Sequence, residues 1–266
     1  MRTEEFFSRL WLDYVEVTPQ AEKIKRLFEN SDGVVINDHV AFRTFANTPL
    51  QLNHLEPLIL SMGYRHQDSY TFKVKKLRAL SYIHPDPELP KIFCSELLSE
   101  QLSTKSQKII ASYTRQIAER PEMLSVFWSG RHWDMPSWQD YSNLLAESEY
   151  GAWLLALGIR VNHFTISVNH LKTTHSINEV LNRIKLAGFE INSAGGEVKG
   201  CPEILLEQGA TMADRQSFTF AGGDKHEIST CFYEFALRYT DKDGQLYQGF
   251  VEANADKIFE STHIVQ

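Results

Sequence analysis

The sequence predicts an α+β fold in which two βαβββ modules form one incomplete β-barrel, with N-terminal helices and a helical insert. Three observations lead to this prediction. A strand with a histidine near its start occurs twice, a helix of matching length follows each strand, and β-rich sequence follows each helix. A repeat of this kind indicates one supersecondary unit used twice, with the faces of the two copies packed together.

We expect a single domain that spans residues 1–266. Residues 4–16 and a second stretch that begins at Thr18-Pro19 predict two N-terminal helices. The rest of the predicted organisation follows in chain order: the first βαβββ module at 34–100, the helical insert at 103–157 and the second βαβββ module at 159–240.

The strand that opens the first module separates apolar side chains from chemically active ones. In Asp38–Phe45 the period-2 alternation places Val40 and Phe42 on one face. His39 and Arg43 share the other face, roughly 13 Å apart along the strand. In a single strand this pattern usually means that one face is buried and the other lies in water. The pattern indicates a functional site here only because it occurs twice.

The second module repeats the strand at Val161–Val168 and then repeats the helix. The two strands match in their histidine pairs, Asp38-His39 and Asn162-His163. The helices match in their capping boxes, Thr48-Pro49-Leu50-Gln51 and Ser176-Ile177-Asn178-Glu179. Gly63 and Gly188 close the two helices. His39 precedes Gly63 by 24 residues and His163 precedes Gly188 by 25, so the two units have nearly the same length.

The β-rich runs that complete the modules each end in a strand with one glutamate. The first module has runs at Tyr70–Val74, Ala79–Ile83 and Ile92–Leu97, and the second has runs at Ser217–Phe220 and Ser229–Leu237. Glu96 and Glu234 lie in the last run of each module, and we expect them to occupy equivalent places. Glutamate is poorly suited to strands and is rarely buried without a partner, so a cation is expected beside it.

Composition and charge exclude several classes of function. The 266 residues carry a formal net charge of −7, with a pI of about 5.8, so no basic face is available for nucleic acid. The three cysteines have no metal-site spacing and fit a reducing cytoplasm better than a disulfide framework. No apolar stretch is long enough for a membrane span, and no signal peptide is visible.

His39, His163 and Glu234 are the candidate metal ligands. Two imidazoles and one carboxylate, with the remaining positions open, are the ligand set of non-haem Fe(II) oxygenases. A structural role is the alternative for each histidine taken alone. Glu96 could be a fourth ligand, a hydrogen-bond partner of a ligating imidazole or an ordinary ion-pair partner. We expect it outside the metal ligands but close enough to bond an imidazole.

These residues carry a resemblance to known proteins. The repeated unit is similar to the vicinal oxygen chelate superfamily, and three motifs more closely resemble the 2-oxoadipate dioxygenase/decarboxylase family, formerly a domain of unknown function: Asp38–Thr44, Val161–Thr165 and Phe232–Ala236. The resemblance extends from about residue 4 to residue 262. It implies Fe(II) held by His39, His163 and Glu234, with Arg43 binding a substrate carboxylate. It also implies conversion of 2-oxoadipate and O₂ into 2-hydroxyglutarate and CO₂ in lysine breakdown.

Two alternatives to this function follow from the same residues. The first is a metal-dependent isomerase, lyase or hydrolase that uses Glu96 as a ligand or base. The second is a non-catalytic module in which the metal only grips a carboxylate. Arg43 likewise has an alternative role as a structural ion pair, for example with Glu96. The sequence leaves the oligomeric state open.

Overall fold

The first module folds as a strand, a helix and three strands within residues 2–262, the part of the chain that the computed structural model describes. Its elements are β1 (Asn37–Phe45), α3 (Leu52–Leu60), β2 (Arg65–Phe72), β3 (Leu77–Ile83) and β4 (Lys91–Leu97). β4 returns to lie parallel to β1, and β2, β3 and β4 pair in antiparallel order. The strand that carries His39 therefore lies at the inner edge of its module.

The second module repeats this pairing. Its elements are β5 (Val161–Ser167), α7 (Ile177–Leu186), β6 (Lys199–Cys201), β7 (Leu206–Ala210) and β10 (Phe232–Arg238). β10 returns parallel to β5, and β7 pairs antiparallel with both β10 and β6. The two modules thus share one topology, which is the unit that the sequence repeat predicts.

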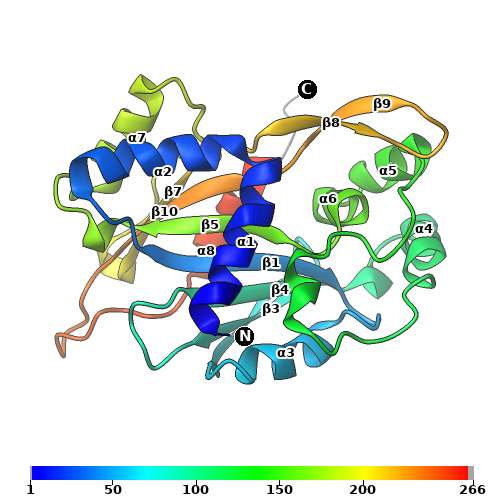
Figure 1. Ribbon diagram of the computed structural model, residues 1–266, viewed down its shortest axis with the longest axis horizontal. Coiled ribbons are helices and arrows are strands. Elements are labelled where there is room, and N and C mark those ends of the chain that lie inside the picture. Colours follow the sequence, from blue (N-terminus) through cyan, green and yellow to red (C-terminus); the bar gives the residue numbers. More distant parts are fainter. Residues whose placement is uncertain (1, 263–266) are drawn as a thin grey trace.

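The modules join through β1 and β5, which pair antiparallel at the centre of one eight-stranded sheet. The strand order is β2-β3-β4-β1-β5-β10-β7-β6. Both histidine-bearing strands are therefore central and adjacent, while β2 and the three-residue strand β6 lie at the two edges. Figure 1 shows the sheet running across the molecule with helices on both of its faces. The predicted α+β fold, with two modules in one incomplete barrel, is confirmed.

Two strands of the second module differ from the prediction. Residues 217–219, expected in the main sheet, belong to β8 (Arg215–Thr219), which pairs only with β9 (Lys225–Ser229) in a separate hairpin. The main sheet instead uses β6 and β7. Phe218 in β8 and Phe220 just after it give this run a strong strand signal, whereas β6 and β7 are short and each contains a glycine, which weakens the signal.

The helix starts of the two modules also differ. In α7 the predicted cap is present, since Ser176 Oγ accepts from the Glu179 backbone N–H. In the first module the predicted start at Thr48 is wrong, because α3 begins at Leu52. Thr48 Oγ1 accepts from Leu50 N within a turn, and the N-terminus of α3 is bound by the Glu96 carboxylate, which accepts from Leu52 N at 2.8 Å.

The remaining helices cover the two faces of the sheet. They are α1 (Thr3–Val17), α2 (Pro19–Asp32), the insert helices α4 (Thr104–Thr114), α5 (Trp138–Leu145) and α6 (Glu149–Leu157), and α8 (Glu252–Ile258), which continues into the 3₁₀ turn η5 (Phe259–Thr262). α1 packs Trp11 against Phe164, and α2 packs Phe28 against Phe235. Figure 1 shows α1 and α2 in front of the sheet and α8 behind it. The face behind the sheet carries the candidate site.

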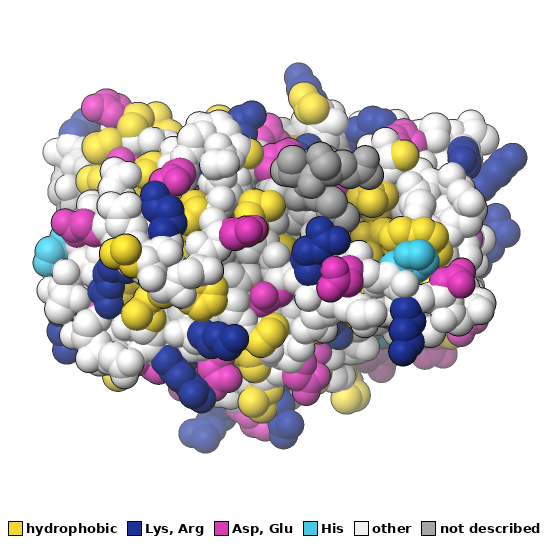
Figure 2. Space-filling view, turned by 90° about the horizontal axis from the view of Figure 1, so that it is seen from above, with side chains coloured by type: hydrophobic (Ala, Val, Ile, Leu, Met, Phe, Trp, Pro, Cys, Tyr) yellow, Lys and Arg dark blue, Asp and Glu magenta, His cyan; other side chains and the backbone are white. Residues whose placement is uncertain are grey.

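The face of the molecule shown in Figure 2 carries both acidic and basic side chains. Basic and acidic side chains are interspersed on the face shown in Figure 2, with small apolar groups between them. Within residues 2–262, no helix combines the length and the apolar character that a membrane span requires.

Candidate metal centre

Three side chains from neighbouring strands converge on the face of the sheet that α8 covers. They are His39 of β1, His163 of β5 and Glu234 of β10, and all three are buried. His163 Nε2 lies 3.1 Å from Glu234 Oε2, and His39 Nε2 lies 3.6 Å from Glu234 Oε1. One ligand atom of each residue lies within 4.8 Å of the other two. The structure therefore brings together the three residues that the sequence proposed as metal ligands.

Strand register explains this convergence. In the antiparallel pair β1–β5, His163 lies opposite Ala41, and His39 is two residues from Ala41. In the parallel pair β5–β10, His163 lies opposite Phe232, and Glu234 is two residues further along. Side chains two residues apart on a strand share a face, so all three residues point to the same side of the sheet.

Both imidazoles are oriented by the residue that precedes them. His39 Nδ1 lies 2.8 Å from Asp38 Oδ1, and His163 Nδ1 lies 3.0 Å from Asn162 Oδ1. An oxygen acceptor at Nδ1 selects the tautomer with its hydrogen on that atom and leaves Nε2 unprotonated, with a lone pair that can bind a metal. The lone pairs of the two Nε2 atoms then point at the lone pairs of the Glu234 oxygens. These acceptors repel each other unless a cation lies between them. The residues present therefore fit a divalent metal ion.

Electrostatics give the cluster the protonation state of a ligand set. Burial lowers the pKa of His163, and the Glu234 carboxylate opposes that shift only in part. Burial alone would raise the pKa of Glu234, but the nearby His39, His163 and Gln208 outweigh it and hold the pKa below its usual range. A neutral imidazole and an ionised carboxylate, the forms that bind metals, result at neutral pH.

The cavity beside the three side chains is small and mostly aromatic. It encloses about 20 Å³, enough for a water molecule or an ion, and is lined by His39, Phe93, His163, Gln208, Glu234, Phe250, Ala255, Ile258 and Phe259. The Phe250 ring stands perpendicular to His39 at a centroid distance of 4.8 Å, and Phe232 stacks on His163 at 4.6 Å. The apolar walls keep the polar cluster largely out of water.

Arg43 lies next to this cavity but does not line it. Its guanidinium is buried, with Nη1 donating to Glu149 Oε1 at 3.2 Å and Nη2 donating to Thr262 Oγ1 at 3.1 Å. Among residues 2–262, no side chain or backbone group accepts a hydrogen bond from its Nε–H. The Phe259 ring, which lines the cavity, lies 5.7 Å from the guanidinium. The ion-pair partner suggested from the sequence, Glu96, is wrong, because the partner is Glu149.

Glu96 lies on the other side of the sheet. In the register of β1 and β4, His39 pairs with Lys91, and Glu96 is five residues beyond Lys91. Glu234 is only two residues beyond the partner of His163, so the odd offset turns Glu96 to the opposite face. There its carboxylate binds Leu52 N and Arg78. The expected equivalence with Glu234 and the expected bond to an imidazole are both wrong, and Phe93 occupies the equivalent place.

The comparison with known proteins identifies the family. The model of a family described as 2-oxoadipate dioxygenase/decarboxylase matches residues 13–248. A rice protein named 2-oxoadipate dioxygenase/decarboxylase is 36% identical over 274 residues, which cover 94% of this chain and 75% of the rice protein. The chain belongs to the 2-oxoadipate dioxygenase/decarboxylase family. The resemblance stated from the sequence motifs is confirmed.

Solved structures place this family member among proteins with the same fold. A rice hydroxyglutarate synthase in complex with 2-oxoadipate matches with a TM-score of 0.91 and 35% identity, covering 97% of this chain and 91% of the rice chain. A Shewanella frigidimarina protein classed as a hydrolase candidate matches with a TM-score of 0.87 and 46% identity. The match covers 94% of this chain and 98% of the Shewanella chain. A glyoxalase-superfamily protein from Ralstonia eutropha, 21% identical, shares the fold with a TM-score of 0.76. The match covers 93% of this chain and 85% of the Ralstonia chain.

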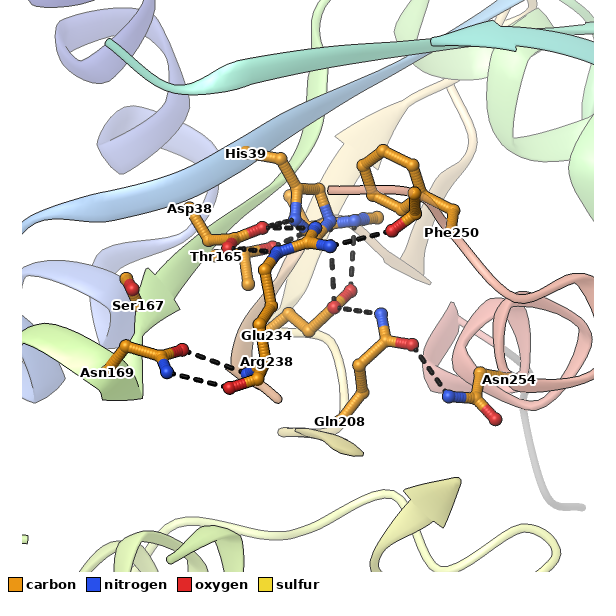
Figure 3. Close-up of polar contacts among 12 residues, drawn as sticks. Asp38, His39, Thr165, Ser167, Asn169, Gln208, Glu234, Arg238, Phe250 and Asn254 are labelled. Carbon is orange, nitrogen blue, oxygen red and sulfur yellow. Dashed lines mark hydrogen bonds and ion pairs between the residues drawn. The ribbon is translucent and has the colours of Figure 1, made fainter. Parts of the chain in front are cut away.

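Several residues of this family member's site were not found from the sequence. Arg238 of β10 donates to both Asp38 oxygens, from Nε at 2.6 Å and from Nη2 at 2.8 Å (Figure 3). The Arg238 charge holds the pKa of Asp38 well below its usual range, although burial acts in the opposite direction. Gln208 binds Glu234, and Thr165 Oγ1 lies 3.0 Å from His39 Nε2. The sequence contains one indication of these supporting contacts, namely that Asp38 and Asn162 each directly precede a histidine.

Proposed function

We propose that this protein is an Fe(II)-dependent dioxygenase that decarboxylates a 2-oxo dicarboxylic acid such as 2-oxoadipate. The observation that carries the proposal is the buried cluster of His39, His163 and Glu234 in a chain of this family. Two imidazoles and one carboxylate on one side of an ion leave positions for a chelating 2-oxo acid and for O₂. A related rice enzyme binds 2-oxoadipate in its crystal structure, which supports this choice of substrate.

The proposed reaction balances with 2-oxoadipate and O₂ alone, and it needs no external reductant. The 2-oxoadipate loses one carboxyl group as CO₂, and both atoms of O₂ enter the remaining five-carbon chain to give 2-hydroxyglutarate. When bound, iron supplies the Lewis acidity and the redox chemistry that the side chains lack. The chain's own residues hold the ion on one side, keep His163 neutral and Glu234 ionised, and exclude water with Phe93 and Phe250.

Arg43 is proposed to bind the distal carboxylate of the substrate. It shares a strand face with His39, four residues or roughly 13 Å along β1, and the reach of both side chains shortens that span to a five- or six-carbon diacid. Its Nε–H, which has no acceptor within the described part of the chain, could bind an oxygen of that carboxylate. Because the cavity beside the cluster holds only about 20 Å³, substrate entry requires that Phe259 and its neighbours on α8 and η5 move.

A metal-dependent hydrolase is the second candidate, since the similar Shewanella protein is classed as a hydrolase candidate. The form of this alternative that uses Glu96 as a ligand or base has no support, because Glu96 points away from the cluster and binds α3. A hydrolase would release product without O₂, and a binding module would release none.

The test is to load metal-free protein with Fe(II) anaerobically, add a panel of 2-oxo acids and measure O₂ uptake. We expect uptake with 2-oxoadipate, none without iron, and none in His163→Ala or Glu234→Gln loaded in the same way. Turnover of the panel with no O₂ consumption would overturn the proposal in favour of the hydrolase. The cytoplasmic location and the role in lysine breakdown stay predictions.

A further inference from the structure

Gln208 is the residue that fixes one oxygen of the Glu234 carboxylate. It lies on β7, opposite Ala236 of β10, so it shares the face of Glu234 across one strand pair. Gln208 Nε2 donates to Glu234 Oε1 at 2.6 Å, and both side chains are buried. With Oε1 held by Gln208, Oε2 faces His163 Nε2 at 3.1 Å. The two carboxylate oxygens thus have different partners and a fixed plane.

Asn254 of α8 decides which way the Gln208 amide points. Asn254 Nδ2 donates to Gln208 Oε1 at 3.0 Å, which turns the Gln208 NH₂ group toward Glu234 (Figure 3). The same Nδ2 also lies 3.3 Å from Leu206 O and 3.4 Å from Lys199 O. A reversed Gln208 amide would set its oxygen against the carboxylate, and like acceptors repel each other. Asn254 therefore excludes the orientation that would repel Glu234.

The neighbouring backbone is shaped to admit Asn254. Gly200 of β6 has a φ of +85°, and a Cβ built on it would lie 2.6 Å from Asn254 Nδ2 and 2.1 Å from Leu206 O. A residue with a side chain at position 200 would push Asn254 away from Gln208 and would be strained as well. The close approach of α8 to the edge of the sheet thus depends on a glycine.

We propose that Gln208 and Asn254 are positioning residues that hold the Glu234 carboxylate in one metal-binding orientation. The inference rests on the proposed metal site. It assigns the C-terminal helix a role in that site although α8 contributes no ligand. Polar groups that orient metal ligands typically contribute 10–100-fold to metal affinity or activity, because a free ligand must be ordered when the ion binds.

The test measures Co(II) binding to metal-free protein, with no substrate present. Gln208→Met keeps the length of the side chain but removes the donor. Asn254→Leu removes the residue that orients Gln208. We expect each variant to bind Co(II) about 10–100-fold more weakly, with an altered visible absorption spectrum of the bound ion. Because the two residues act in series, the double variant should bind no more weakly than Gln208→Met alone.

Asn192→Leu is the matched control. Asn192 is also a buried amide and also binds the C-terminal segment, donating to Lys257 O at 2.9 Å and Ser261 Oγ at 2.8 Å, but it has no bond to Gln208. This variant should lower the melting temperature and leave the Co(II) affinity and spectrum unchanged. An equal loss of Co(II) affinity in Asn192→Leu would assign the effect to packing of the segment and overturn the inference.

Two other results separate this inference from the proposed function. Co(II) affinity within twofold of the parent protein in both Gln208→Met and Asn254→Leu, with binding abolished in His163→Ala, would overturn the positioning role and leave the metal site standing. No binding of Co(II) to the parent protein would overturn the metal site, and the positioning role with it. If Gln208→Met does not fold, the comparison of Asn254→Leu with Asn192→Leu still decides the question.

Discussion

Each histidine of the cluster follows a residue that binds its Nδ1, but the two supports differ in charge. Asn162 is a neutral amide, whereas Asp38 is a buried carboxylate held by Arg238, which also donates to Gly249 O at 2.7 Å. The Asp38–Arg238 pair therefore joins β1 to β10 and to the backbone before the C-terminal helix. The sequence showed the two matching pairs, but it gave no reason to connect Arg238 with Asp38, 200 residues away.

Asp38→Asn should destabilise the metal-free protein by about 3 kcal/mol, because it leaves the buried Arg238 charge without its counter-charge. Urea unfolding at neutral pH measures the change. Since the pKa of Asp38 lies well below its usual range, its stabilisation is present above about pH 4 and is lost as the pH falls further. The difference in the free energy of unfolding between the parent protein and Asp38→Asn should therefore shrink as the pH falls below about 4.

The exposed pair Glu22–Arg26 provides the control for this change. Glu22→Gln makes the same substitution of an amide for a carboxylate beside an arginine, at an N–O distance of 2.6 Å in the parent. It should cost less than about 1 kcal/mol, because an exposed ion pair contributes little. Equal losses in the two variants would show that burial of the Asp38 pair has no energetic consequence.

Arg43→Lys should raise the KM for a 2-oxo dicarboxylic acid and lower kcat/KM by about 1.5–3 kcal/mol, because lysine keeps the charge but loses the planar fork. Metal content should not change. A monocarboxylic 2-oxo acid of equal length has no distal charge and should be affected much less. Equal damage to both substrates would show that Arg43, with its bonds to Glu149 and Thr262, supports the fold rather than selecting the acid.

At the scale of elements, periodicity and capping predicted most helices, and contacts between distant elements decided the exceptions. Ser176 caps α7 as expected because its cap is local. α3 begins at Leu52 because Glu96 binds its N-terminus, and that bond joins residues 44 positions apart. The equivalence of Glu96 and Glu234 failed for a related reason, since it depends on the pairing register of β4 with β1. A single sequence does not specify that register.

Gly158→Ala should destabilise the protein by about 2–5 kcal/mol. Gly158 ends α6 with a φ of +75°, and a Cβ there would lie 2.1 Å from the carbonyl carbon of Gly130. The cost combines a backbone conformation that essentially only glycine adopts, with φ +75° and ψ −159°, and a clash against Gly130, whose backbone is bonded to Ile159 in a β-bridge. Thermal unfolding of the two proteins measures it.

Gly188→Ala separates the two contributions. Gly188 follows α7 with a φ of +87°, and no atom of residues 2–262 lies within 4 Å of a Cβ built on it. It should cost only the backbone term, about 1–2 kcal/mol. A loss in Gly158→Ala no larger than that in Gly188→Ala would contradict the close packing of α6 against Gly130.

At the scale of the whole molecule, a duplicated unit brings one histidine from each copy to the central strand pair, β1 and β5. Only one copy supplies a glutamate, because the equivalent place in the other is Phe93, which forms an apolar wall. The repeat, the two histidines and Glu234 could be predicted from periodicity and matching lengths. The short strands β6 and β7, and with them Gln208, could not. The position of β7 depends on pairing with β10, that of β6 depends on pairing with β7, and both depend on packing against neighbouring helices.

In the proposed reaction, both atoms of O₂ are joined to the decarboxylated 2-oxo acid. The most direct test is to convert 2-oxoadipate under ¹⁸O₂ with the iron-loaded protein and to measure ¹⁸O incorporation into each product by mass spectrometry. We expect equal amounts of CO₂ and 2-hydroxyglutarate, with both labelled atoms in the 2-hydroxyglutarate and none in the CO₂. Product without label, or formed in the absence of O₂, would contradict it.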